Sequence, residues 1–377
     1  MAKKIYVGVN GIARKVKKMY VGVGNVARKV KKGYIGVGGV ARPFFSGGEV
    51  AYYGLISPLS VARSGVAASA VGNYALFGGG SVDGTRQSIV DAYNKSLTHS
   101  TPTPLSSSRG LLAATSVGNY ALFGGGNKTS SKDNTVDAYN LSLTRTTPTP
   151  LSKARGDISA AFIGDYALFA GGSLSNTTRS NVVDAYDSSL TRTLPTVLSE
   201  VKCESPATRI GNYALIGGGL SRNGKTNGVD GYSSSLTRIA VSGLSRSRTG
   251  LAASHTNKHA LFCGGNDYAN IAFNTVDAYD SALTRTAPMP LSEVRMDAAA
   301  ASIGGFVLIC YGWNTDTLAP STTVDVYDDS LTRTNRFSTS IQMEDPASVD
   351  FGDYALFSGG ENSYTNDGIS DVEVISV

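Results

Sequence analysis

The sequence predicts an all-β protein built from seven copies of one unit, and three observations support this class. A motif read as GNYALFGGG recurs at spacings of 46 to 48 residues, a period typical of repeat architectures. Each copy divides into four short pieces rich in β-forming residues and separated by turn signals. Apolar residues nowhere follow a helical period, and 44 of the 377 residues are glycine. The copies are marked by the residues at one equivalent position: Tyr74, Tyr120, Tyr166, Tyr213, His259, Phe306 and Tyr354.

The second copy shows the four predicted strands most clearly, at 112–117, 120–123, 135–139 and 145–151. Four short strands in a unit of this length are typical of a propeller blade. We therefore predict a seven-bladed β-propeller over residues 49–377. The last copy ends after its third strand, and segment 51–63 aligns without gaps with residues 143–155. Residues 51–63 are therefore expected to complete the last blade and close the ring, which removes two open sheet edges.

Residues 1–48 predict a separate arm of three β-hairpins. Three 14-residue repeats cover 3–16, 17–30 and 31–44, and each has two β-prone halves around a turn such as Asn10-Gly11. In the first repeat this turn places Val9 opposite Ile12 and Val7 opposite Arg14. The arm holds eleven Lys or Arg and no acid, whereas the rest of the chain holds 23 bases and 29 acids. This split indicates two different roles, and we expect the arm to serve in assembly or anchoring.

Candidate binding residues lie in the loops between the second and third strands, because these loops differ from copy to copy on a regular framework. Aromatic side chains in such loops stack on sugar rings or anchor protein contacts, although they also pack under their own loops. The candidates for ligand or receptor binding are Tyr268, Phe273, Trp313 and Tyr364. The candidates for anchoring are the basic residues Lys3, Lys4, Arg14, Lys17, Lys18, Arg28, Lys31, Lys32 and Arg42.

Few residues in the sequence favour catalysis or metal binding. An acid recurs at one position of each third strand, and we expect it to cap backbone groups or to pair with a base that recurs at Arg63, Arg109, Arg155, Lys202, Arg248 and Arg295. Only His255 and His259 lie close together as potential copper ligands, and Cys263 and Cys310 occupy a small-residue packing position. The segment 22–27 matches a dinucleotide-binding pattern, but it repeats after 14 residues and no helix follows. We therefore expect no enzyme activity, no cofactor and no metal.

The double glycine after the second strand, as at Gly125-Gly126, and the later Tyr139 resemble the kelch-repeat β-propeller family over roughly residues 50–377. Where kelch repeats carry a tryptophan, this chain has a Thr-Arg pair, as at Thr144-Arg145. The basic hairpin repeats are similar to N-terminal segments of bacteriophage structural and tail-associated proteins.

These resemblances imply a bacteriophage virion protein: a tail fibre, baseplate or other surface component involved in host attachment. Its expected partners are other virion proteins, through the arm, and a host-surface glycan or protein. We further expect a homo-oligomer on the particle, made in the host cytoplasm, without membrane insertion and without nucleic acid as the main partner. Two alternatives remain open, an intracellular kelch-type interaction scaffold and a propeller enzyme that acts on glycans.

Overall fold

The protein is all β in the part of the chain that the structure describes. The computed structural model describes six strands within residues 1–49, then residues 50–362, 365 and 367–377. No helix occurs among these residues. None of the described residues forms a helix long and apolar enough to cross a membrane.

Seven sheets in the described residues contain four antiparallel strands each, and we number them one to seven. Sheets one to four consist of β8 (Ala67–Val71), β9 (Tyr74–Gly78), β12 (Val90–Asn94) and β13 (His99–Ser100); β14 (Ala113–Val117), β15 (Tyr120–Gly124), β16 (Val136–Tyr139) and β17 (Arg145–Thr146); β18 (Ser159–Ile163), β19 (Tyr166–Ala170), β20 (Val183–Asp187) and β21 (Arg192–Thr193); β23 (Ala207–Ile210), β24 (Tyr213–Gly217), β27 (Val229–Ser233) and β28 (Arg238–Val241). Sheets five to seven consist of β29 (Thr249–His255), β30 (Ala260–Asn266), β31 (Val276–Tyr279) and β32 (Arg285–Thr286); β33 (Ala299–Ile303), β34 (Phe306–Cys310), β37 (Thr323–Tyr327) and β38 (Arg333–Ser338); β39 (Ala347–Phe351), β40 (Tyr354–Ser358), β43 (Val372–Ser376) and β7 (Ala51–Ile56).

Shorter pairings involve the loops between second and third strands, and one of them also includes β22 (Lys202–Cys203), which precedes the first strand of sheet four. They are β10 (Ser81–Val82) with β11 (Thr85–Arg86); β22 with β25 (Leu220–Ser221) and β26 (Gly224–Lys225); β35 (Trp313–Asn314) with β36 (Ala319–Pro320); and β41 (Glu361–Asn362) with β42 (Asp367–Gly368).

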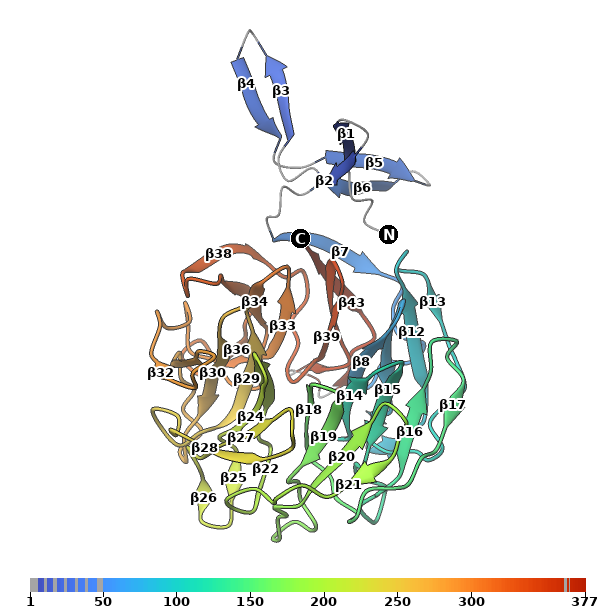
Figure 1. The fold of residues 1–377 in the computed structure, drawn as a ribbon, viewed down its shortest axis with the longest axis vertical. Coiled ribbons are helices and arrows are strands. Elements are labelled where there is room, and N and C mark those ends of the chain that lie inside the picture. The colour runs from blue at the N-terminus through green and yellow to red at the C-terminus, as the bar shows by residue number, and fades with distance from the viewer. Residues whose placement is uncertain are drawn as a thin grey trace.

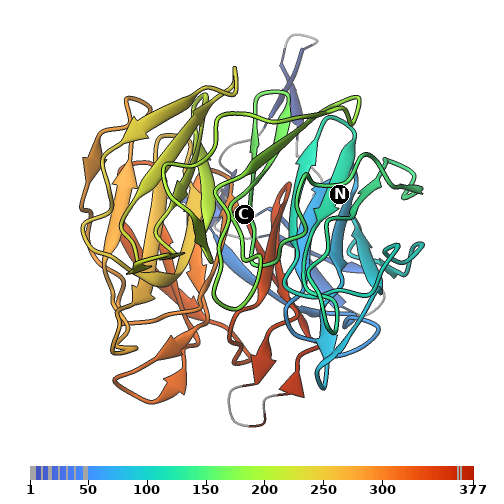
Figure 2. The same cartoon turned by 90° about the horizontal axis from the view of Figure 1, so that it is seen from below.

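The sheets lie around a common centre in chain order. The first strand of each sheet contacts the first strand of the next, from β8 through β14, β18, β23, β29 and β33 to β39. Strand β39 in turn contacts β8. Figure 1 shows the last sheet beside the first, and Figure 2 shows the same grouping from a perpendicular direction. This arrangement is propeller-like, as the sequence predicts.

Glycine at the end of the second strand allows neighbouring sheets to approach closely. A Cβ atom on Gly78 would lie 2.9 Å from the ring of Phe123 in sheet two. A Cβ on Gly124 would lie 2.7 Å from Phe169 in sheet three. Both rings are fully buried, so the repeated Phe-Gly pair forms the packed layer between these sheets.

Strand β7 pairs with β43, so the beginning and end of the described body meet in one sheet. The register places Ala51 beside Ser376 and Ile56 beside Val372. Ser376 also pairs with Tyr354, which follows the short turn between β39 and β40. The chain before Ala51 therefore joins the body at the end of the sheets that carries the short turns. The long loops lie at the opposite end.

The outer strands are shorter than the sequence predicts. Residues 145–151 are expected to form one strand, but β17 covers only Arg145–Thr146. Pro148 and Pro150 follow, and proline cannot donate a hydrogen bond to a strand ladder. The segment serves instead as a linker that accepts a bond from the next sheet, because Tyr186 Oη donates to the Thr149 carbonyl oxygen at 2.8 Å.

The arm contains three hairpins: β1 (Tyr6–Val9) with β2 (Ile12–Lys15), β3 (Met19–Val23) with β4 (Val26–Val30), and β5 (Gly33–Val37) with β6 (Val40–Phe45). Val9 pairs with Ile12 and Val7 pairs with Arg14, so the predicted register of the first hairpin is confirmed. The turn residues lie outside the described residues.

Candidate functional site

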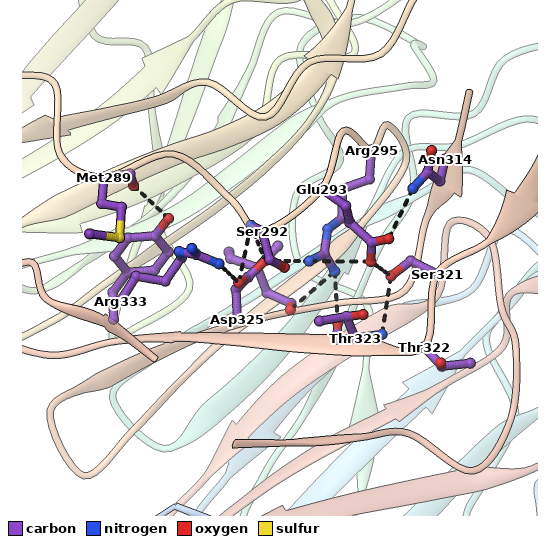
Figure 3. A network of polar contacts seen from close by, with 12 residues as sticks. Met289, Ser292, Glu293, Arg295, Asn314, Ser321, Thr322, Thr323, Asp325 and Arg333 are labelled. Atoms are coloured by element: carbon purple, nitrogen blue, oxygen red, sulfur yellow. Dashed lines mark hydrogen bonds and ion pairs between the residues drawn. The ribbon is translucent and has the colours of Figure 1, made fainter. Parts of the chain in front are cut away.

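The repeated acids and bases form buried ion pairs within the sheets. In sheet six, the guanidinium of Arg295 donates to the carboxylate of Asp325 and to the Thr323 carbonyl oxygen, the latter at 2.8 Å. The same carboxylate accepts the backbone N–H of Ser292 at 3.2 Å (Figure 3). Both charged side chains are fully buried. Equivalent pairs occur in five other sheets: Arg63–Asp91, Arg109–Asp137, Arg155–Asp184, Lys202–Asp230 and Arg248–Asp277.

The arginine of the repeated Thr-Arg pair contacts the same carboxylate from the outer strand. In sheet six, Arg333 Nη1 lies 2.9 Å from Asp325 Oδ1. In sheet one, His99 Nε2 lies 2.7 Å from Asp91 Oδ1. In six sheets the acid thus lies between an inner base and an outer arginine or histidine, an arrangement that favours a structural role. No group of His, Cys, Asp or Glu suited to a metal ion occurs among the described residues.

Sheet seven satisfies its acid in a different way. Met343 occupies the arginine position, and Glu373 replaces the aspartate. The hydroxyl of Tyr311 donates to Glu373, which also accepts the backbone N–H of Ser340 at 2.7 Å. Burial, followed by the charge of Glu373, raises the pKa of Tyr311 well above its ordinary value, so the phenol remains a hydrogen-bond donor.

The three predicted binding aromatics that the structure describes have different environments. Tyr268 is 67% exposed, and its hydroxyl donates to the Lys225 carbonyl oxygen at 2.9 Å. Phe273 is half-buried, with the guanidinium of Arg246 4.3 Å from its ring centre. Trp313 is half-buried in a short hairpin. Tyr364 lies outside the described residues.

The loops that carry these residues are joined to one another. Lys225 Nζ donates to Asn266 Oδ1 at 2.9 Å, which links the loops of sheets four and five. The backbone N–H of Ala272 donates to Thr315 Oγ1 at 3.2 Å, which links the loops of sheets five and six. These adjacent loops also expose two aliphatic side chains, Ile271 at 54% and Leu318 at 68%. We call Tyr268, Ile271 and Leu318 the loop surface; a search limited to aromatic residues misses the two aliphatic members.

An acidic mouth lies at the same end of the sheets as the long loops. Seven equivalent residues at or just before the start of the first strands adopt positive φ angles: Gly65, Leu111, Asp157, Glu204, Gly250, Asp297 and Asp345. Several donate a backbone hydrogen bond to the equivalent residue of the preceding sheet, such as Asp345 to Asp297 at 2.9 Å. Together they line a cavity of about 490 Å³.

The four acids of this mouth repel one another. Enclosure by the chain, followed by the charges of Glu344 and Glu204, raises the pKa of Asp297 to about 6. Asp345 is exposed at the mouth, and loss of hydration among the surrounding loops, followed by the charges of Asp297 and Glu361, raises its pKa to about 7. The sequence signal for this cluster is the residue two positions after each repeated base, where an acid replaces glycine or leucine in four copies.

The candidate anchoring residues are described only in part. Arg14, Arg28 and Arg42 lie at equivalent registers of the three hairpins, opposite Val7, Val21 and Ile35. The six other candidates lie outside the described residues: Lys3, Lys4, Lys17, Lys18, Lys31 and Lys32.

The remaining potential nucleophiles and ligands are shielded. Burial raises the pKa of the Cys263 thiol to about 12, which disfavours the reactive thiolate. His255 lies on β29 and His259 precedes β30, and burial followed by the charge of Arg209 lowers the pKa of His255 to about 4.

Comparison with known proteins supports the fold. No protein-family model matches the chain, and no curated protein matches it. Among solved structures, the chain is similar to that titled "Structure of YjhT", with a TM-score of 0.60 and 12% identity over 75% of this chain and 99% of that one. At this identity the similarity shows a β-propeller-like fold alone.

Proposed function

We propose that the chain is a seven-bladed, kelch-like β-propeller closed by β7, and that it is a non-enzymatic structural protein of a bacteriophage virion. The arm of residues 1–48 anchors it to other virion proteins, and its long-loop end binds the host surface or a neighbouring protein. The observation that carries this proposal is that the arm joins the body at one end of the sheets and the loop surface lies at the other. The register of β7 joins the arm at the short-turn end, whereas the loop surface lies at the other end.

Two further observations support binding rather than catalysis. The repeated acids and bases are engaged in buried pairs within the sheets. The loops of sheets four to six are joined by hydrogen bonds, so the loop surface is held in one arrangement before a partner arrives. A surface ordered in advance loses less conformational entropy on binding.

Host-cell adsorption by particles that carry variant protein tests the recognition role. We expect the double variant Tyr268→Ala/Leu318→Ala to adsorb at least about tenfold less, because exposed apolar anchors dominate binding energy. The matched control is Leu194→Ala/Val197→Ala, which removes exposed apolar groups from an outer linker. Normal adsorption by the loop variant would contradict recognition through the loop surface.

Incorporation into particles tests the anchoring role. Changing Lys17, Lys18, Lys31 and Lys32 together to Glu reverses four charges, which lowers the net charge of the arm by eight units and leaves the body unaltered. We expect this variant to fold but to be absent from particles. Incorporation at the normal level would contradict anchoring by the basic arm. Turnover of host cell-wall glycans by the purified protein would favour the enzyme alternative instead.

A further inference from the structure

The strongest unassigned feature is a ring of side chains on the wall of the central channel, near the short-turn end. One equivalent position of the seven first strands forms this channel ring: Ala70, Ser116, Phe162, Arg209, His255, Ser302 and Asp350. The equivalent position two residues earlier carries only small side chains: Ala68, Ala114, Ala160, Ala207, Ala253, Ala300 and Ser348. Charged and aromatic residues therefore occur in the channel ring, whereas the position two residues earlier carries only alanine or serine.

Strand geometry places this ring on the channel wall. Successive side chains of a strand point to opposite faces, so positions two residues apart share a face. In β18, Ala161 and Ile163 are buried between sheets while Phe162 is more accessible. Phe162, Arg209, His255 and Asp350 all line one cavity of about 400 Å³. This volume lies within the range of small-molecule pockets.

Arg209 is a cation without a partner in the described part of the chain. Its side chain is exposed to the channel, and no hydrogen bond or ion pair to it occurs among the described residues. Its guanidinium carbon lies 5.8 Å from the centre of the Phe162 ring, and its charge acts on His255 and Asp350. The inner arginines, by contrast, are all paired with carboxylates. A guanidinium left available in a cavity is suited to bind a carboxylate through two parallel hydrogen bonds.

Asp350 lies on the same cavity wall, three sheets further along. One of its oxygens accepts the backbone N–H of Ser302 at 2.7 Å. No ion pair between Asp350 and Arg209 occurs among the described residues, although the charge of Arg209 acts on Asp350 to lower its pKa. The side chain of Asp350 is exposed to the channel, but loss of hydration within the channel has the larger, opposing effect and raises its pKa. Above this raised pKa the carboxylate is ionised and can accept a hydrogen bond from a ligand.

The cavity thus offers two opposite charges on strands of different sheets, and its lining also includes the aromatic ring of Phe162 and small side chains such as Ala70. A simple anion would pair with Arg209 but would be repelled by the carboxylate of Asp350. A ligand with a carboxylate and a separate donor group satisfies both. We propose that the channel ring binds a small organic acid that also carries a hydrogen-bond donor, with its carboxylate on Arg209 and its ammonium or hydroxyl group on Asp350.

This site is independent of the proposed recognition role, because the loop surface lies at the other end of the sheets. His255 is neutral at pH 7, since burial and Arg209 lower its pKa to about 4, so it adds no second cation. An amino acid is the simplest ligand of the proposed class.

Three isosteric probes separate the two contacts: alanine has a carboxylate and an ammonium group, lactate a carboxylate and a hydroxyl, and propionate a carboxylate alone. Titration calorimetry on the full chain at pH 7.5 and constant ionic strength measures each dissociation constant. We expect alanine to bind most tightly and propionate most weakly. Arg209→Gln should weaken all three by about tenfold or more, because a charge-assisted bidentate contact is lost.

Arg222→Gln is the matched control, since Arg222 is an exposed arginine in the long loop of the same sheet. It should leave all three dissociation constants unchanged. Asp350→Asn should retain propionate binding and remove most of the advantage of alanine, which a merely structural role of Asp350 would not produce. Binding that does not depend on Arg209, or no binding of any probe at about 20 mM, roughly twentyfold above a dissociation constant of about 1 mM, would overturn the proposal.

Discussion

Replacing Arg109 with methionine tests whether the buried ion pairs stabilise the sheets. Arg109 is fully buried, and its Nη2 donates to Asp137 Oδ2 at 2.6 Å and to the Phe123 carbonyl oxygen at 3.1 Å. Its Nη1 donates to the Thr135 carbonyl oxygen at 2.7 Å. One side chain therefore connects the second and third strands of sheet two. Methionine has a similar length and occupies the equivalent position, Met343, in sheet seven.

The expected cost follows from what remains after the change. Asp137 would keep the backbone N–H of Ser106 at 3.1 Å and the outer Arg145 at 3.5 Å. Removal of one partner from a buried pair costs about 3–5 kcal/mol, and the remaining contacts of Asp137 place this variant near the lower end. Sheet two also lacks the tyrosine hydroxyl that satisfies Glu373 in sheet seven. We therefore expect Arg109→Met to lower the free energy of unfolding by about 3 kcal/mol.

Thermal and urea unfolding, followed by circular dichroism, measure this loss. For a chain of this size, about 3 kcal/mol corresponds to a fall in Tm of roughly 4 °C. Arg109→Lys should cost less, on the order of 1–2 kcal/mol, because Lys202 forms the equivalent pair in sheet four, with its Nζ 3.0 Å from Asp230 Oδ2. The exposed Arg222→Met serves as the control. A Met variant within about 1 kcal/mol of the unaltered protein would refute a stabilising role, by the ordinary range of surface substitutions.

The remaining predictions concern the acidic mouth and the outer strand of sheet seven. In the folded protein the pKa values of Asp297 and Asp345 are about 6 and about 7, above the ordinary aspartate value of 3.8. Between about pH 4 and about pH 7 the native state therefore binds more protons than the unfolded state. The free energy of unfolding should fall as the pH rises from about 4 to about 7. Asp297→Asn should therefore raise the free energy of unfolding at pH 8 by on the order of 1 kcal/mol, allowing for solvent screening, and leave Tm unchanged at pH 4. An equal effect at both pH values would contradict a raised pKa at Asp297. Deletion of residues 1–48 should leave Tm nearly unchanged, whereas deletion of 1–62 removes β7 and the buried Leu59 and should lower stability by at least about 2 kcal/mol. Equal melting temperatures for the two deletions would show that β7 does not stabilise sheet seven.

The sequence by itself determined the features that act over short distances or repeat regularly. Alternation and turn residues located the strands of each copy, and the Asn-Gly type of turn set the register of the first arm hairpin. The acid and base at fixed positions of the first six copies indicated the buried pairs, such as Arg109 with Asp137. A repeated unit must bury the same groups in the same way, so one pattern predicts all of its copies.

Only the tertiary structure decided which single residues of different copies come together. Arg209 and Asp350 are 141 positions apart, and they share a cavity because the first strands of seven sheets surround one channel. Exposure also depended on packing: Tyr268 is mostly exposed while Phe273 lies against Arg246, although both are aromatics of one loop. Local patterns specify strands and turns, but side chains from distant copies meet only where the stacked sheets bring their backbones together. The channel ring and the loop surface therefore could not be predicted from any single copy.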